Sequence, residues 1–162
     1  MPLLAWIFAG LIALTPAHTA TYVAALPGLQ GVFTGTPQGI GLTEGGLSPC
    51  PDSPNCVVSQ EADPSHAIAP IPYQGSRQQA YATLKDVLSV VPRTKIVAET
   101  DNYIHAESSS RLMGFVDDVE FYFPADTPVI HMRSAARLGE SDLGVNRRRL
   151  EQIRLAAQDL GL

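Results

Sequence analysis

Hydrophobic side chains recur at helical spacing in two segments of the chain. The first segment covers residues 76–91, where Ser76 is suited to cap a helix and Pro92 to end it. The second begins at about Leu143 or Val145 and ends near residue 160. The apolar positions of the first segment are Ala80, Tyr81, Leu84, Val87, Leu88 and Val91, and those of the second are Leu150, Ile153, Ala157 and Leu160. We therefore predict two amphipathic helices.

Hydrophobic and polar side chains alternate between these helices, as they do in half-buried strands. Alternating segments cover residues 95–100, 103–108, 115–123 and 128–136, and turn residues separate them. A shorter candidate strand covers residues 67–73. The pattern predicts an α+β fold, in which an antiparallel sheet of four to five strands carries two helices on one face.

The first residues of the chain are apolar and carry no side-chain charge. Residues 3–14 have the length of a signal-peptide core, and small residues that include Ala25 follow them. We predict that residues 1–25 are a signal peptide, with a membrane anchor over residues 3–26 as the alternative. Both assignments predict a protein exported to the periplasm, and the anchor would also tether it to the membrane.

Residues 26–46 are rich in glycine and proline and show no periodic face, so they predict a flexible linker. Residues 47–162 are then expected to form a single α+β domain. The only two cysteines, Cys50 and Cys56, lie at its start, and in an exported protein they favour a disulfide over a redox centre or a metal site. Loop entropy gives so small a ring a stabilisation of about 2 kcal/mol.

The sheet face that points away from the helices is predicted to be rich in polar side chains. Antiparallel pairing across a short loop places Arg133 opposite Asp118 or Glu120, and His131 opposite Glu120 or Tyr122. An acid and a base therefore meet across the strands in both registers. The polar side chains expected on this face are His105, Glu107, Asp118, Glu120, Tyr122, His131 and Arg133.

This polar face supports three interpretations. His105, Glu120 and His131 could bind a transition metal, or a His–Glu pair could act as the general base of a hydrolase. The third interpretation, which we favour, is a solvated face with cross-strand ion pairs, with or without a docked partner. The sequence has no GxSxG, HExxH, P-loop or Cys–His pattern, so we lean against an enzyme and expect no cofactor.

Arginines gather at the start of the last predicted helix. Arg147, Arg148 and Arg149 lie in its first two turns, where positive charge opposes the helix dipole and requires an anionic neighbour. We favour an internal carboxylate as that neighbour, and a bound anion or acidic partner is the functional alternative. The candidate carboxylates are Asp117, Asp118, Glu140, Asp142 and Glu151, and the candidate binding residues are Arg133, Arg137, Asn146, Arg147 and Arg148.

Charge excludes one class of partner. The chain has 11 Lys and Arg against 16 Asp and Glu, which gives a net charge of −5. No Lys or Arg precedes Arg77, and those that follow are interleaved with acids. A nucleic-acid binder needs a concentrated basic surface, so we expect no nucleic-acid partner.

Three motifs follow one another along the second part of the chain. They are Cys-Pro-Asp-Ser-Pro-Asn-Cys-Val at 50–57, Gly-Phe-Val-Asp-Asp-Val-Glu at 114–120 and Gly-Val-Asn-Arg at 144–147. The chain thereby resembles, over about residues 47–155, a bacterial and plastid family known only as a domain of unknown function, numbered 1499. Val58 and Ala136 stand where that resemblance leads us to expect serine, so no hydroxyl chemistry at those positions applies to this chain.

The resemblance implies no activity, substrate or cofactor, and its plastid members make the thylakoid lumen the second choice of compartment. Our leading hypothesis is an exported, non-catalytic binding or accessory domain that holds an anionic small molecule or a protein partner. The alternatives are a small hydrolase or metal-dependent enzyme, and a purely structural extrinsic protein.

Overall fold

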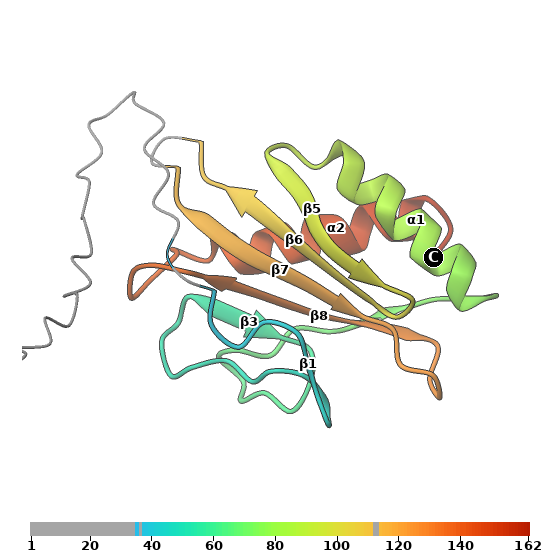
Figure 1. Ribbon diagram of the computed structural model, residues 1–162, viewed down its shortest axis with the longest axis horizontal. Helices are drawn as coiled ribbons and strands as arrows, with labels where there is room; N and C mark the ends of the chain where they lie inside the picture. Colours follow the sequence, from blue (N-terminus) through green and yellow to red (C-terminus); the bar gives the residue numbers. More distant parts are fainter. Residues whose placement is uncertain (1–34, 36, 112–113) are drawn as a thin grey trace, which may run out of the picture.

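The computed structural model describes residues 35, 37–111 and 114–162 (Figure 1). The predicted signal peptide or anchor lies outside the described residues. None of the helices in the described part is both long and apolar enough to cross a membrane. The elements in chain order are β1 (Leu42–Thr43), β2 (Gly46–Leu47), β3 (Cys56–Val58), β4 (Ile71–Pro72), α1 (Arg77–Val90), β5 (Thr94–Thr100), β6 (Tyr103–Ser109), β7 (Val116–Tyr122), β8 (Val129–Ala136) and α2 (Val145–Asp159).

Both predicted helices are confirmed, and their ends have local causes. The Ser76 hydroxyl accepts a hydrogen bond from the Gln79 amide at 3.2 Å, and the Gln79 side chain accepts one from the Ser76 amide at 3.1 Å. This reciprocal capping box starts α1, and Pro92 follows its end. Helix α2 has Gly144 at its N-cap, and the Asp142 carboxylate accepts from the backbone amides of Gly144 and Asn146.

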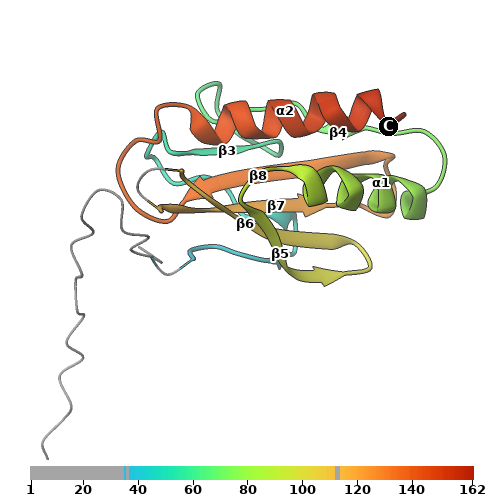
Figure 2. The same cartoon turned by 90° about the horizontal axis from the view of Figure 1, so that it is seen from above.

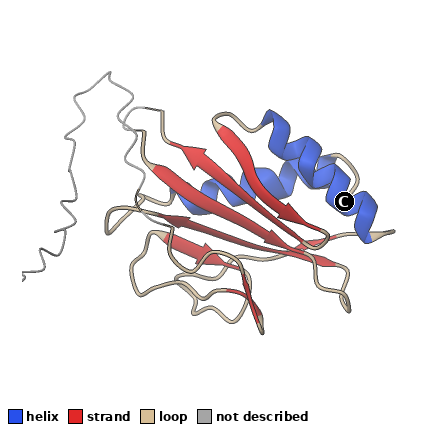
Figure 3. Ribbon diagram, viewed as in Figure 1, coloured by secondary structure: helices blue, strands red, loops and turns tan. Residues whose placement is uncertain are grey.

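The α+β class is confirmed, with a sheet that is larger than predicted. Strands β3, β8, β7, β6 and β5 are neighbours in that order, and β4 also pairs with β8, so the main sheet has six antiparallel strands (Figure 3). The extra strand is β3, whose three residues are all buried and therefore show no alternation. The candidate strand at 67–73 is shorter than predicted, because only Ile71 and Pro72 pair with β8.

The hydrophobic core lies between the sheet and the two helices. Phe121, Ile104 and Met132 point from the sheet toward Leu84 of α1 and Leu150 of α2, and all five are fully buried. These sheet residues alternate with the polar ones, as the sequence pattern predicts. Both helices therefore cover one face and leave the opposite face, which we call the outer face, to another part of the chain.

The amino-terminal segment covers part of the outer face, on the other side of the sheet from α2 (Figure 2). Strands β1 and β2 form a hairpin, and Leu47 packs in a second apolar cluster with Val58 and Tyr103. The sequence predicts a flexible linker through Gly46, but the described end of that segment is paired and packed. The prediction that this face is solvated is wrong for His105, Asp118, Glu120 and Arg133, which are buried, whereas the predicted cross-strand ion pair is present.

Candidate functional site

A buried ion pair joins β7 and β8 at the centre of the outer face. Glu120 and Arg133 are directly opposite partners, and the Arg133 Nη1 lies 2.7 Å from the Glu120 Oε2. The Glu120 Oε1 accepts from the Tyr103 hydroxyl at 2.7 Å and from the Gly41 amide at 2.9 Å. Of the two registers predicted from the sequence, the structure has the one that pairs Arg133 with Glu120. The Gly41 contact attaches the amino-terminal segment to this pair.

A second charged group lies beside the first. Asp118 accepts hydrogen bonds from the Nε and Nη2 of Arg137 at 2.9 and 2.7 Å, and it lies 2.7 Å from the Nε2 of His105. Arg137 also contacts Glu107. Burial alone would raise the pKa of Asp118, but the hydrogen bonds from Arg137 and His105 outweigh it and hold the pKa below its ordinary value. Asp118 is therefore a carboxylate at neutral pH, with its charge already compensated.

A pocket of about 470 Å³ lies next to these groups, and we call it the arginine pocket. Its volume is in the range of small-molecule sites. The sheet supplies Arg133 and Asp118, the loop after β8 supplies Arg137, and the amino-terminal segment supplies Gly39, Cys50 and Asn55. Two guanidinium groups and one carboxylate thus line the pocket.

Arg133 uses only part of its guanidinium group. Its side chain is 3% exposed, and its single hydrogen bond within the described residues runs from Nη1 to Glu120. The Nε is buried and has no partner among the described atoms. A Cβ at Gly39 would lie 3.8 Å from the Nη2, so the backbone at Gly39 borders this side of the group. The Nε and Nη2 together form the edge of a guanidinium that can hold a carboxylate or phosphate with two parallel hydrogen bonds.

Of the arginines at the start of α2, Arg149 has the internal carboxylate partner that the sequence favours, whereas Arg147 and Arg148 bond to backbone oxygens. Arg149 forms an ion pair of 2.6 Å with Asp117, whose pKa is raised by burial despite that pair. Arg147 donates to the backbone oxygens of Ala67 and Ser65, and Arg148 donates to that of Leu143. Neither Arg147 nor Arg148 lines the arginine pocket, so the structure brings together only Arg133 and Arg137 of the proposed arginines.

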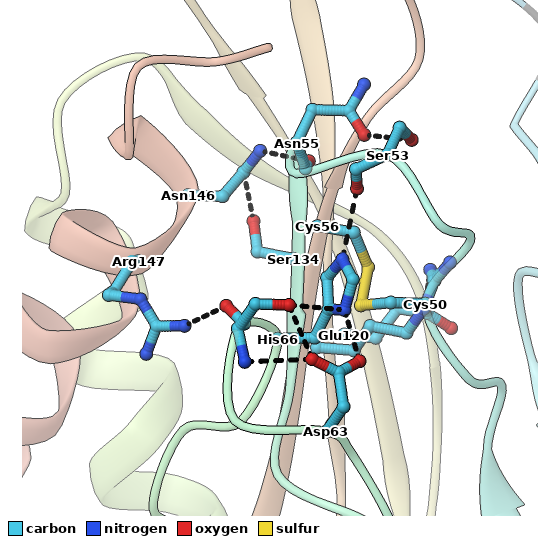
Figure 4. Close-up of a disulfide and its surroundings, with 12 residues drawn as sticks. Cys50, Ser53, Asn55, Cys56, Asp63, His66, Glu120, Ser134, Asn146 and Arg147 are labelled. Atoms are coloured by element: carbon cyan, nitrogen blue, oxygen red, sulfur yellow. Dashed lines mark hydrogen bonds and ion pairs between the residues drawn. A yellow bond between two sulfur atoms is a disulfide. The ribbon is translucent and has the colours of Figure 1, made fainter. Parts of the chain in front are cut away.

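Asn146 is fully buried and acts as a brace between distant segments (Figure 4). Its amide nitrogen donates to the Asn55 carbonyl at 3.0 Å, and its oxygen accepts from Ser134. It therefore joins α2 to β8 and to the loop that precedes β3, and it does not face the arginine pocket. Asn55 lines the pocket and was missed in the sequence, since an asparagine in a proline-rich loop is typical of a turn.

The three residues of the enzyme alternative do not form one site. His105 pairs with Asp118, Glu120 is enclosed by Arg133 and Tyr103, and the Nδ1 of His131 lies 3.1 Å from the Ser59 hydroxyl. Within the described residues, no group of three His, Cys, Asp or Glu side chains could hold a metal ion. The metal and hydrolase alternatives therefore gain no support from the geometry.

The predicted disulfide is present between Cys50 and Cys56 (Figure 4). Next to it, His66 lies 2.6 Å from Asp63 and 3.2 Å from the Ser53 carbonyl, so the imidazole holds the crosslinked loop in place. The disulfide and His66 thereby fix the wall of the arginine pocket that carries Cys50, Ser53 and Asn55.

The fold and the site define an α+β domain whose polar sheet face is partly covered by its own amino-terminal segment. The model of a protein family of unknown function, DUF1499, matches residues 46–156, and the chain belongs to this family. Neither a curated protein nor a solved structure matches the chain.

Replacing Arg133 tests the buried pair. Arg133→Ala leaves the fully buried Glu120 carboxylate without its counter-charge, so we expect a loss of about 3–5 kcal/mol in the free energy of unfolding, measured by chemical denaturation. The double variant Arg133→Ala/Glu120→Gln should regain much of that loss, because no buried carboxylate is then left without its counter-charge. Arg154→Ala, at a half-exposed pair, serves as the control. A loss no larger than that of the control would contradict the buried-pair interpretation.

The pKa values of two histidines should be shifted in opposite directions from the ordinary value of about 6.5. The hydrogen bond that His66 donates to Asp63 raises the pKa of His66, and burial lowers the pKa of His131. The stability contributed by His66 is present below pH 6.5 and is lost as the pH rises through its folded pKa. That of His131 is present above pH 6.5 and is lost as the pH falls through its folded pKa. Imidazole resonances followed by NMR across this range check both directions, and identical titrations would disprove them.

Proposed function

We propose that this domain is a non-catalytic binding module that holds a small ligand carrying a carboxylate or phosphate group in the arginine pocket. The observation that supports the proposal most directly is the unused edge of Arg133. A buried N–H without a partner costs free energy, on the order of 1–3 kcal/mol, and a ligand oxygen would remove that cost. The buried Glu120 holds the guanidinium in place from its other side.

The charges around the pocket favour an anionic ligand. Arg133 and Arg137 line the pocket together with a single carboxylate, Asp118, and both oxygens of Asp118 already accept hydrogen bonds. Glu120 stands behind Arg133 and is not a lining residue. The lining therefore has an excess of positive charge, even though the whole chain has a net charge of −5.

Export remains part of the proposal. A disulfide persists in the periplasm, or in a comparably oxidising compartment such as the thylakoid lumen, and not in a reducing cytosol. The Cys50–Cys56 pair and the apolar stretch at residues 3–14 support the periplasm, with the lumen as the alternative. Because Cys50 lines the pocket, oxidation there would also set the shape of the binding site.

Arg133→Lys tests the ligand site separately from the fold. Lysine keeps a positive charge beside Glu120 but cannot present two parallel N–H groups. The affinities for inorganic phosphate and for citrate are measured by isothermal titration calorimetry on the wild-type chain and on this variant. We expect both affinities to be about tenfold lower in the variant, because one charge-assisted hydrogen bond is lost.

Arg154→Lys, on the exposed side of α2, is the matched control and should bind both probes like the wild type. On binding, the Nε–H resonance of Arg133 should shift in the NMR spectrum of the wild-type chain. Unchanged affinity of Arg133→Lys would refute the ligand site, and so would the failure of both anions to bind the wild type.

Opening the disulfide should weaken both the fold and the site. Cys50→Ser/Cys56→Ser removes a crosslink that, for a loop of this size, contributes about 2 kcal/mol to stability. We expect the free energy of unfolding to fall by about that amount. Probe affinity should also fall, because the loop wall is no longer fixed. If calorimetry and denaturation show the double variant to be unchanged, the crosslink does not shape the pocket.

A further inference from the structure

A second concentration of positive charge lies away from the arginine pocket. It is found at the end of the molecule where β6 and β8 end and α2 begins (Figure 1). A hollow of about 390 Å³ there is lined by Arg93, Arg111, Arg148 and Arg149, together with the serines at 108–110. No carboxylate is among its lining residues. We call this hollow and its rim the basic end.

Most of these arginines have no acidic partner. Arg149 pairs with Asp117, but Arg93 and Arg148 donate only to the backbone oxygens of Ser109 and Leu143, at 3.1 and 2.9 Å. In the described part of the chain, no ion pair involves Arg93, Arg111 or Arg148.

The neighbouring loop supplies little compensation for these charges. The carboxylate of Asp142 on that loop accepts from two backbone amides, and Glu140 is exposed. Three like charges that converge on one hollow repel one another and attract an anionic surface.

Apolar residues are also part of the basic end, since Val91 and Val145 line the hollow. Leu143 is 84% exposed and Val90 is 76% exposed, and in sequence they lie within two residues of the lining residues Val145 and Val91. These side chains add nothing to the core. A soluble ion would be bound by the arginines but would leave Leu143 and Val90 in water. These side chains therefore favour a partner that offers both negative charge and an apolar layer.

The backbone is strained at two of these positions. Arg93 and Leu143 have φ angles of 55° and 54°, in the left-handed region that favours glycine and costs other residues about 1–2 kcal/mol. Neither side chain offsets that conformational cost through contacts in the core, since Leu143 is almost fully exposed and Arg93 forms no ion pair within the described residues. Residues kept in strained conformations without a folding benefit are typical of functional surfaces.

We propose that the basic end lies on the surface of an anionic phospholipid membrane. The arginines would meet the lipid phosphates while Leu143 and Val90 enter the interfacial layer, which combines the two attractions that hold proteins at membrane surfaces. The position of the chain supports this assignment. A Cβ at Gly35 would lie 3.0 Å from the Leu138 side chain, so the chain that follows the apolar stretch 3–26 enters the domain beside the loop that carries Leu143.

Hydrogen–deuterium exchange on the full chain locates the contact. We expect slower exchange in residues 138–144 with vesicles of phosphatidylcholine and phosphatidylglycerol than with vesicles of phosphatidylcholine alone. High salt should remove most of that protection, because it screens the arginines. Residues 1–34 are the same in every sample, so a difference in this loop reports on the basic end.

The variant Arg93→Gly/Leu143→Gly removes one charge and the most exposed apolar side chain while relieving both strained positions. It should fold at least as stably as the wild type, yet the lipid concentration for half-maximal protection should rise at least about tenfold. The matched control, Arg77→Gln/Leu160→Gly, makes the same kind of change at the opposite end and should behave like the wild type (Figure 1).

Three results would overturn the membrane assignment. Equal protection by inorganic phosphate alone, measured on Arg133→Lys, would show a soluble-ion site at the basic end. Equal protection on neutral and anionic vesicles would remove the role of the arginines, and an exchange pattern unchanged by any vesicle would exclude the surface contact. Because Gly139 of this loop lines the arginine pocket, the phosphate comparison uses Arg133→Lys, which weakens the proposed ligand site and leaves the basic end unchanged, so the two proposals fail separately.

Discussion

The buried Glu120 carboxylate is the constraint on which the rest of this structure depends. A carboxylate with no exposed surface stays charged only if its surroundings replace water, and three groups do so here. Arg133 supplies the counter-charge across the strands, Tyr103 donates from β6, and Gly41 donates from the amino-terminal segment. One side chain thereby links three strands to a segment almost eighty residues away in sequence.

That linkage gives the domain a polar layer where a second hydrophobic layer would be expected. The helices bury the apolar face of the sheet, while the hairpin and the disulfide loop bury the outer face through hydrogen bonds, ion pairs and a small apolar cluster around Leu47. The same arrangement leaves one guanidinium edge without a protein partner. Arg133 can be held rigidly and still have binding capacity, because Glu120 engages only one of its nitrogens.

The sequence predicts those elements in which hydrophobic and polar residues alternate or recur with a regular period. Alternation locates β5 to β8 and excludes a one-residue slip, which would turn Phe121 out of the core, but it leaves two registers for β7 and β8. It does not predict β3, which is buried on both faces, nor the hairpin, where glycine permits the turn but provides no pattern. Alternation identifies the polar face correctly but cannot show whether water or protein covers it. That depends on contacts such as Gly41 with Glu120, which carry no local signal.

The two proposed sites share one loop. Arg137 and Gly139 line the arginine pocket, whereas Leu138 and Leu143 are exposed a few residues away, and the Gly139 carbonyl accepts from the pocket residue Asn55. A ligand that fixes this loop also fixes the apolar side chains that we place at the membrane. If the loop conformation affects both ligand binding and membrane contact, the coupling between the two must be reciprocal. Membrane contact then changes the ligand affinity by the same factor by which the ligand changes the membrane affinity. The loop from Arg137 to Gly144 is therefore the segment through which the charged sheet face can act on the domain's surroundings.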